Sequence, residues 1–173
     1  MDAAEAQRER EESRPGGRLT DRLAGLALTL AALGVLAVAV WLSPAAAGVG
    51  THTQLGMAPC GFLASTGLPC ATCGMTTATA LAADGRLVAS ALTQPAGLLF
   101  ALGLGAAFWV GSWLAVSGRP AAPVFAALGR AAFSGRGLLL VLVVVGASWA
   151  YKAVRVAADG HAGADSTLGV FLV

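Results

Sequence analysis

All three cysteines of this 173-residue chain lie close together in the sequence, at Cys60, Cys70 and Cys73. Cys70 and Cys73 form a Cys-x-x-Cys pair, a spacing found in redox dithiols and in halves of many zinc sites. Cys60 adds a third thiol ten residues upstream of Cys70. The spacing therefore indicates thiol chemistry of one of three kinds: a disulfide, a reactive dithiol or a metal site.

Each of the three interpretations uses these cysteines differently. A disulfide from Cys60 to Cys70 or Cys73 would close a longer, less strained loop than one between Cys70 and Cys73. A redox function would exchange electrons with a partner through Cys70 and Cys73, although the strand-helix context of thioredoxins is absent from the sequence. A Cys3His metal site would add His52 to the three thiols and could take zinc or copper. The sequence favours the structural interpretation, and it does not by itself imply a particular cofactor.

The residues around the cysteines predict a loop that leads into a short helix. Prolines and glycines, among them Gly67, Pro69 and Gly74, make residues 59–74 a poor continuous helix. Residues 75–83 are predicted to form a short helix that ends at an Asp-Gly turn. Cys73 would then lie at the helix N-terminus, where the helix dipole favours a thiolate.

The run from Cys60 through Gly67-Leu68-Pro69-Cys70 to Cys73-Gly74-Met75-Thr76 resembles a bacterial membrane-protein family known as domain of unknown function 2752. The family pattern is a Cys, then Cys-Pro-x-Cys-Gly-x-Thr-Arg, a short helix, a Gly/Asp turn and an Asn-Pro before the next span. The motif positions carried over are Gly67, Pro69, Gly74 and Thr76.

Two residues depart from that pattern, because Ala71 stands in place of proline and Thr77 in place of arginine. Gln94-Pro95 stands where Asn-Pro is expected. The resemblance extends over about residues 59–155 if Trp149-x-Tyr151-Lys152 is taken as the family's aromatic-basic ending of the last span. It implies an integral membrane protein with a cysteine-containing cap, and it implies no activity.

Composition places the chain in a membrane. Hydrophobic residues make up 57% and charged residues 12% of the sequence, about half the charged fraction of ordinary soluble domains. About 20 apolar residues in a helix cross the hydrocarbon core of a bilayer. We predict an all-α membrane protein with three spans, at about residues 20–42, 95–116 and 137–156, inside a membrane domain of residues 19–156. This domain includes a cysteine cap at 57–85. A charged disordered tail (1–18) precedes the domain, and a C-terminal tail (157–173) follows it.

Small residues in the second predicted span favour close helix packing, because they let two backbones approach each other. They form two rows: Gly97, Ala101 and Gly105, and Gly103, Ala107 and Gly111. We expect these rows to pack within the chain, and a homo-oligomer or another membrane protein is the alternative partner.

The distribution of basic residues favours an N-terminus inside a bacterial cytoplasmic membrane, with the cap on the extracytoplasmic side. The three carboxylates beyond the N-terminal region, Asp84, Asp159 and Asp165, lie outside the predicted spans, so the sequence gives no indication of an ion path. No catalytic constellation is evident, and the net charge of +2 argues against nucleic-acid binding. The predicted function is a non-enzymatic membrane scaffold or accessory subunit with a disulfide- or thiol-stabilised cap. The alternative is a thiol-redox or metal-handling protein that acts through Cys70 and Cys73 with Cys60.

Overall fold

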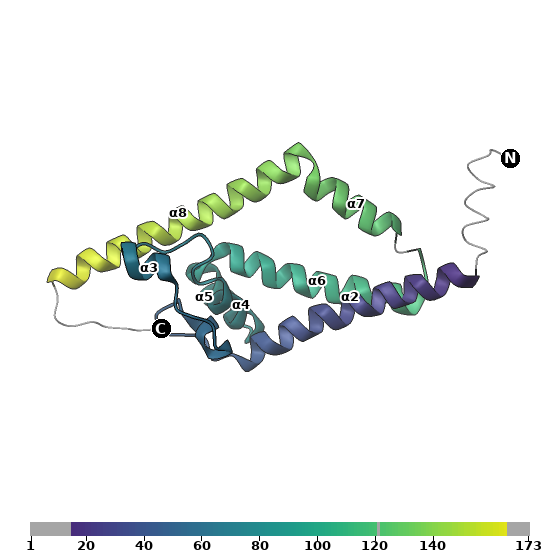
Figure 1. Cartoon of the computed structure of the whole chain (residues 1–173), viewed down its shortest axis with the longest axis horizontal. Coiled ribbons are helices and arrows are strands. Elements are labelled where there is room, and N and C mark those ends of the chain that lie inside the picture. The colour runs from purple at the N-terminus through teal and green to yellow at the C-terminus, as the bar shows by residue number, and fades with distance from the viewer. Residues whose placement is uncertain (1–14, 121, 166–173) are drawn as a thin grey trace. The chain divides into compact units, whose positions relative to one another are not determined.

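The computed structural model describes residues 15–120 and 122–165, and the described part is helical without strands (Figure 1). Predictions for the tail before residue 15 and for the last eight residues, 166–173, lie outside the described residues. The elements in chain order are α2 (Pro15–Trp41), η1 (Thr51–Leu55), α3 (Gly61–Thr66), α4 (Met75–Ala83), α5 (Leu87–Thr93), α6 (Pro95–Ser117), α7 (Ala122–Phe133) and α8 (Gly135–Asp165).

Within residues 15–120 and 122–165, three helices are long and apolar enough to cross a membrane: Arg18–Trp41 within α2, Pro95–Ser117 (α6) and Gly135–Ala158 within α8. The second matches the predicted span to within one residue. The other two helices run past the predicted ends, since α2 begins at Pro15 and α8 continues to Asp165. Proline suits the first turn of a helix, where its missing N–H needs no partner. The structure confirms an all-helical fold with three candidate spans and the cysteines between the first two.

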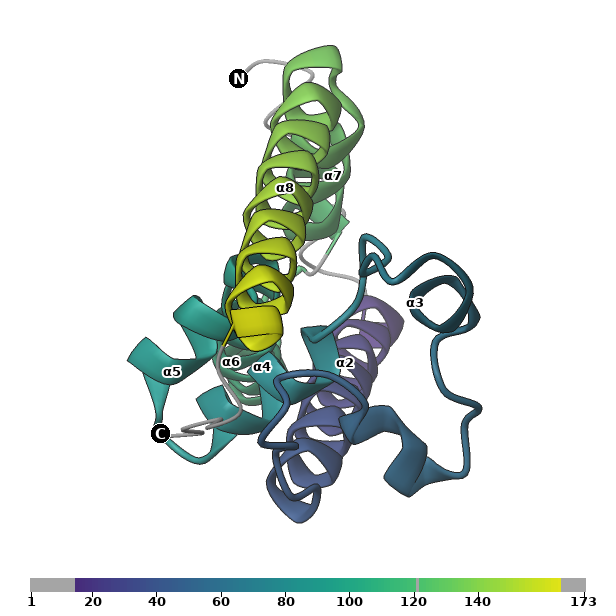
Figure 2. The same ribbon diagram turned by 90° about the vertical axis from the view of Figure 1, so that its left-hand side faces the viewer.

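Four short elements lie outside the sequence predictions: η1, α3, α5 and α7. Helix α3 is a single short helix between Cys60 and Gly67, and it has no buried residue (Figure 2). Gly67 ends it with φ of 71°, a left-handed conformation that glycine adopts without a steric penalty. Residues 59–74 are thus broken, as predicted, but they include one helical segment.

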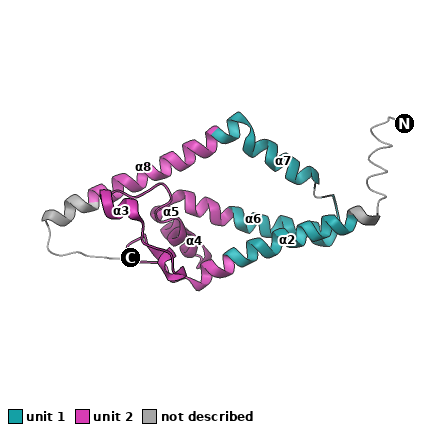
Figure 3. Cartoon of the chain, in the orientation of Figure 1, with its two compact units in different colours: residues 1–35, 103–138 teal, residues 36–102, 139–173 magenta. Residues whose placement is uncertain are grey.

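The chain divides into two compact units, residues 1–35 with 103–138 and residues 36–102 with 139–173 (Figure 3). In the first unit α2 packs directly on α6. A Cβ atom added to Gly25 would lie 2.6 Å from the backbone nitrogen of Ala115, and one added to Gly111 would lie 2.8 Å from the Gly25 carbonyl oxygen. Only glycine permits this approach, and it brings Thr29 Oγ1 within 3.5 Å of Ser112 Oγ.

In the second unit α4 packs against α5 and against the start of α6. The buried hydroxyl of Ser90 in α5 donates to the carbonyl oxygen of Ala78 in α4 at 2.7 Å. A Cβ atom at Gly97 would lie 2.6 Å from the Cβ of Ala78. The first turn of α6 therefore supports the helix that follows the cysteines.

Only some residues of the two small-residue rows pack against other parts of the described chain. Gly97 and Gly111 make close contacts within the chain, and Ala101 is buried. No atom lies within 4 Å of a Cβ built at Gly103 or at Gly105 in the described part of the chain. Association of α6 with another protein or another copy through these remaining positions stays a prediction.

Candidate functional site

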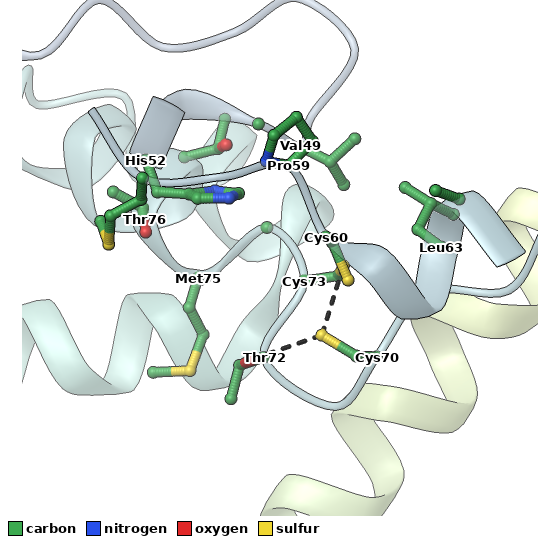
Figure 4. A pocket seen from close by; sticks show the side chains of 15 residues that line it. Val49, His52, Pro59, Cys60, Leu63, Cys70, Thr72, Cys73, Met75 and Thr76 are labelled. Atoms are coloured by element: carbon green, nitrogen blue, oxygen red, sulfur yellow. Dashed lines mark hydrogen bonds between the residues drawn. The ribbon is translucent and has the colours of Figure 1, made fainter. Parts of the chain in front are cut away.

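The three cysteines lie at the ends of two short helices. Cys60 is the N-cap residue of α3. Cys70 and Cys73 are the first and last residues of a turn, in which the Cys73 N–H donates to the Cys70 carbonyl oxygen at 3.0 Å. Gly74 follows with φ of 87° and is the N-cap of α4. The turn and the two helix starts direct all three side chains to one place (Figure 4).

The sulfur atoms form a tight cluster of free thiols. All three Sγ atoms lie within 4.8 Å of one another, and those of Cys70 and Cys73 are 3.4 Å apart. When three thiolates bind a metal ion in a trigonal plane, each sulfur lies about 2.3 Å from the ion and about 4 Å from the other two sulfur atoms. The observed sulfur spacings, from 3.4 Å to at most 4.8 Å, bracket this value.

The thiols of Cys70 and Cys73 differ in acidity. A hydrogen bond with the Thr72 hydroxyl, 3.5 Å from Sγ, is the main cause that lowers the pKa of Cys70 from 9.0 to about 7. Burial is the main cause that raises the pKa of Cys73 to about 12, and its neighbour Cys70 adds to the effect. Near neutral pH, Cys70 is the thiolate of the pair and Cys73 holds its proton.

A cavity of about 570 Å³ opens beside the cluster. All three cysteines line it, together with His52 (Figure 4). The lining also includes two methionines, Met57 and Met75, and apolar residues such as Val49, Pro59 and Leu63. The His52 Nε2 atom lies 3.1 Å from the Ala58 carbonyl oxygen, and the imidazole is not part of the group of clustered donor atoms. The predicted Cys3His set thus shares one cavity, but only its three thiols converge.

Each of the four motif residues has a position in this arrangement. Gly67 ends α3, and Thr76 lines the cavity. Gly74 must be glycine on two grounds: its positive φ, and the 2.7 Å that would separate an added Cβ from the Gly48 carbonyl oxygen. Pro69 is fully buried immediately before Cys70.

Helix α8 contacts the cysteine loop and two neighbouring segments through three donors near its middle. Trp149 Nε1 donates to the Pro69 carbonyl oxygen at 2.9 Å, and the Tyr151 hydroxyl donates to that of Leu92 at 2.9 Å. The Lys152 amino group donates to the carbonyl oxygens of Gly48 and Thr93, each at 3.2 Å. Trp149, Tyr151 and Lys152 are called the α8 clamp below.

Lys152 belongs to the aromatic-basic ending of the last predicted span, and the structure leaves only 7% of it exposed. Buried ionisable groups near a span normally bind carbonyls or other charges, as Lys152 does. The Trp-x-Tyr-Lys run itself could have indicated that this part of the helix binds loop carbonyl oxygens, because it puts three hydrogen-bond donors on little more than one helical turn.

Two further polar contacts hold the loops around the site. Gln94, which is fully buried, donates through Nε2 to the Ala71 carbonyl oxygen at 3.4 Å. Thr51 and Thr77, also buried, share a hydrogen bond of 2.8 Å between their hydroxyl oxygens. The two positions that depart from the family pattern, Ala71 and Thr77, are therefore both bonded into the cap.

A family described as "Protein of unknown function (DUF2752)" matches residues 60–108. Comparison with curated proteins and with solved structures gave no match. The matched segment holds all three cysteines, α3, α4, α5 and the first half of α6, whereas the α8 clamp lies beyond it. The cysteine cap and the start of the second span thus resemble the DUF2752 family of proteins of unknown function.

Proposed function

We propose that this membrane protein binds a thiophilic metal ion through Cys60, Cys70 and Cys73. The observation that carries the proposal is the convergence of three sulfur atoms within 4.8 Å, although Cys60 comes from a different loop. A redox dithiol requires two cysteines, and a disulfide cross-link also requires two. A metal site makes use of all three.

The surroundings of the cluster support this proposal. Thiolates are the metal-binding form of cysteine, and the low pKa of Cys70, about 7, gives one thiolate near neutral pH. The N-terminus of α4 follows Cys73 directly, and its dipole favours negative charge there. An arriving cation displaces the protons of the remaining thiols, so metal binding releases protons.

Metal content measured by elemental mass spectrometry tests the proposal on the full chain purified in detergent. We expect about one ion per chain. Separate Cys60→Ser, Cys70→Ser and Cys73→Ser variants should each bind at least about tenfold more weakly, because each removes one ligand. Ser65→Ala is the matched control, since Ser65 is exposed on α3 and does not line the cavity. Wild-type protein without metal affinity would overturn the proposal.

The unequal thiols favour dithiol exchange as a second candidate function. The Cys70 thiolate would attack one sulfur of a disulfide-bonded partner protein, and the partner's second sulfur would leave as a thiolate. Cys73, 3.4 Å away, would then lose its proton and attack the Cys70 sulfur of this mixed disulfide, and the partner's first sulfur would leave as a thiolate. The Cys70–Cys73 pair is then oxidised and the partner reduced. Mass tagging of thiols after incubation with a disulfide-bonded protein would detect the oxidised pair. The scaffold function, favoured by the sequence, stays a prediction.

A further inference from the structure

We infer that the ion held by this cluster is Cu(I), bound by the three sulfur atoms of Cys60, Cys70 and Cys73 alone. This inference rests on the proposed function and names its metal. It follows from the number of donors, from their chemical softness and from the lining of the adjoining cavity.

The donor set contains only sulfur. Among the described residues, no imidazole and no carboxylate joins the three thiols within the cluster. Structural zinc is almost always four-coordinate, whereas three soft thiolates without a nitrogen or oxygen donor suit Cu(I). The donor count therefore favours a monovalent soft ion over zinc.

A zinc ion could complete its coordination with a water molecule in the cavity, but that water would need polar partners. Several polar groups of the lining are already engaged. The Thr77 hydroxyl is bonded to Thr51, the Thr72 hydroxyl lies against Cys70 Sγ, and the His52 ring nitrogen lies 3.1 Å from the Ala58 carbonyl oxygen. Most of the remaining lining is apolar. Such a cavity suits an ion that keeps no water ligand.

Two thioether groups face the same cavity. Met57 and Met75 line it, and Met75 lies beside Thr72 at the start of α4 (Figure 4). Two of the three methionines in the chain therefore border this one cavity. Thioether sulfur is a soft, neutral ligand that binds Cu(I) well and zinc poorly. We assign Met57 and Met75 to the path by which Cu(I) reaches the thiolates.

The test uses the reduced full chain in detergent, without oxygen, in competition with the chelator bathocuproine disulfonate. We expect one Cu(I) per chain, and X-ray absorption should show three sulfur neighbours and no nitrogen or oxygen neighbour. Added Zn(II) at equal concentration should not displace the copper. Zinc bound with an oxygen or nitrogen ligand in preference to Cu(I) would overturn the inference and leave the proposed metal function intact. Failure of both ions to bind would overturn both.

The Cys60→Ser variant separates a three-sulfur site from a simple Cys-x-x-Cys site. It should still bind Cu(I) through Cys70 and Cys73, with the sulfur number reduced from three to two. An unchanged sulfur number would exclude Cys60 as a ligand and overturn the inference. Met57→Leu with Met75→Leu should slow Cu(I) uptake from the chelator several-fold while the sulfur number stays at three. Uptake at the wild-type rate would remove the methionines from the path.

Discussion

The indole nitrogen of Trp149 and the carbonyl oxygen of Pro69 are joined by a 2.9 Å hydrogen bond across 80 positions of sequence. Pro69 is buried, and the next residue is Cys70, the thiol whose pKa is lowered to about 7. A residue of the third candidate span therefore fixes the backbone from which the central cysteine projects. Groups that orient metal ligands from the second shell commonly alter affinity when they are removed.

Trp149→Phe is expected to weaken metal binding about tenfold without changing the stoichiometry, because an aromatic side chain remains but the hydrogen bond to Pro69 is lost. Isothermal titration against a competing chelator measures the affinity. Trp109→Phe is the matched control, since Trp109 is 72% exposed. Equal affinities of the two variants would show that the Trp149 bond does not position the site.

Lys152→Met is expected to lower the unfolding temperature in detergent. It would leave two carbonyl oxygens, those of Gly48 and Thr93, without their donor, and each such loss typically destabilises by about 1–3 kcal/mol. Tryptophan fluorescence during heating measures the effect. Arg155→Met lies one turn further along the same helix at an exposed position, and it should change the unfolding temperature much less.

Alkylation of metal-free protein should distinguish the thiols by pH. The rate at Cys70 should rise with a midpoint near pH 7, whereas Cys73 should stay unreactive until strongly alkaline pH, following their pKa values of about 7 and about 12. Peptide mass spectrometry after brief iodoacetamide treatment gives both rates.

The Thr72→Val variant tests the physical cause of that difference. Loss of the hydroxyl removes the main interaction that stabilises the Cys70 thiolate, so the pKa should rise and the rate at pH 7 should fall by about an order of magnitude. Thr76→Val, another threonine of the cavity lining, is the control. A pH profile unaltered in Thr72→Val would assign the acidity of Cys70 to another cause.

Two glycine substitutions in α6 should have opposite effects. Gly97→Ala places a methyl group 2.6 Å from the Cβ of Ala78 and should destabilise the protein by about 1–3 kcal/mol. Gly105→Ala meets no atom within 4 Å in the described chain and should be neutral or slightly stabilising, because alanine is the better helix former. Unfolding in mild detergent compares the pair. Destabilisation by Gly105→Ala instead would reveal a contact with another chain.

The orientation proposed from the basic residues, with the N-terminus inside and the cap outside, can be tested in intact cells. A membrane-impermeant maleimide should label the cysteines only after reduction or after treatment with a chelator, depending on whether a disulfide or a metal protects them. Labelling that requires cell lysis would place the cap inside or bury it.

Local sequence patterns predicted much of the fold. The span at 95–116 was anticipated to within one residue, since long apolar runs have one stable arrangement in a bilayer. The helix Met75–Ala83 was predicted with its bounds, because glycine precedes it and Asp84-Gly85 follows it. Helices α3 and α5 were not predicted, since segments of six and seven residues are too short to show a helical period in the sequence.

The candidate site was predicted in its residues but not in its geometry. Cys60, Cys70 and Cys73 were identified from residue type and spacing. The local sequence does not predict, however, that the side chain of Cys60 contacts the turn formed by Cys70–Cys73. The residues of the α8 clamp were noted as the ending of the last span, but their contacts were not predicted, because the partners lie 59 to 104 residues away in sequence. Long-range hydrogen bonds of this kind leave no periodic signal.

The α8 clamp also has a consequence for biosynthesis. The cysteine loop is synthesised before residue 75, but the donors that hold Pro69, Leu92, Thr93 and Gly48 follow more than 70 residues later in the chain. Until the third span is inserted, the thiols lie on a loop that lacks these fixed contacts. The contacts that fix the thiol cluster therefore form only after residues 149–152 have been synthesised.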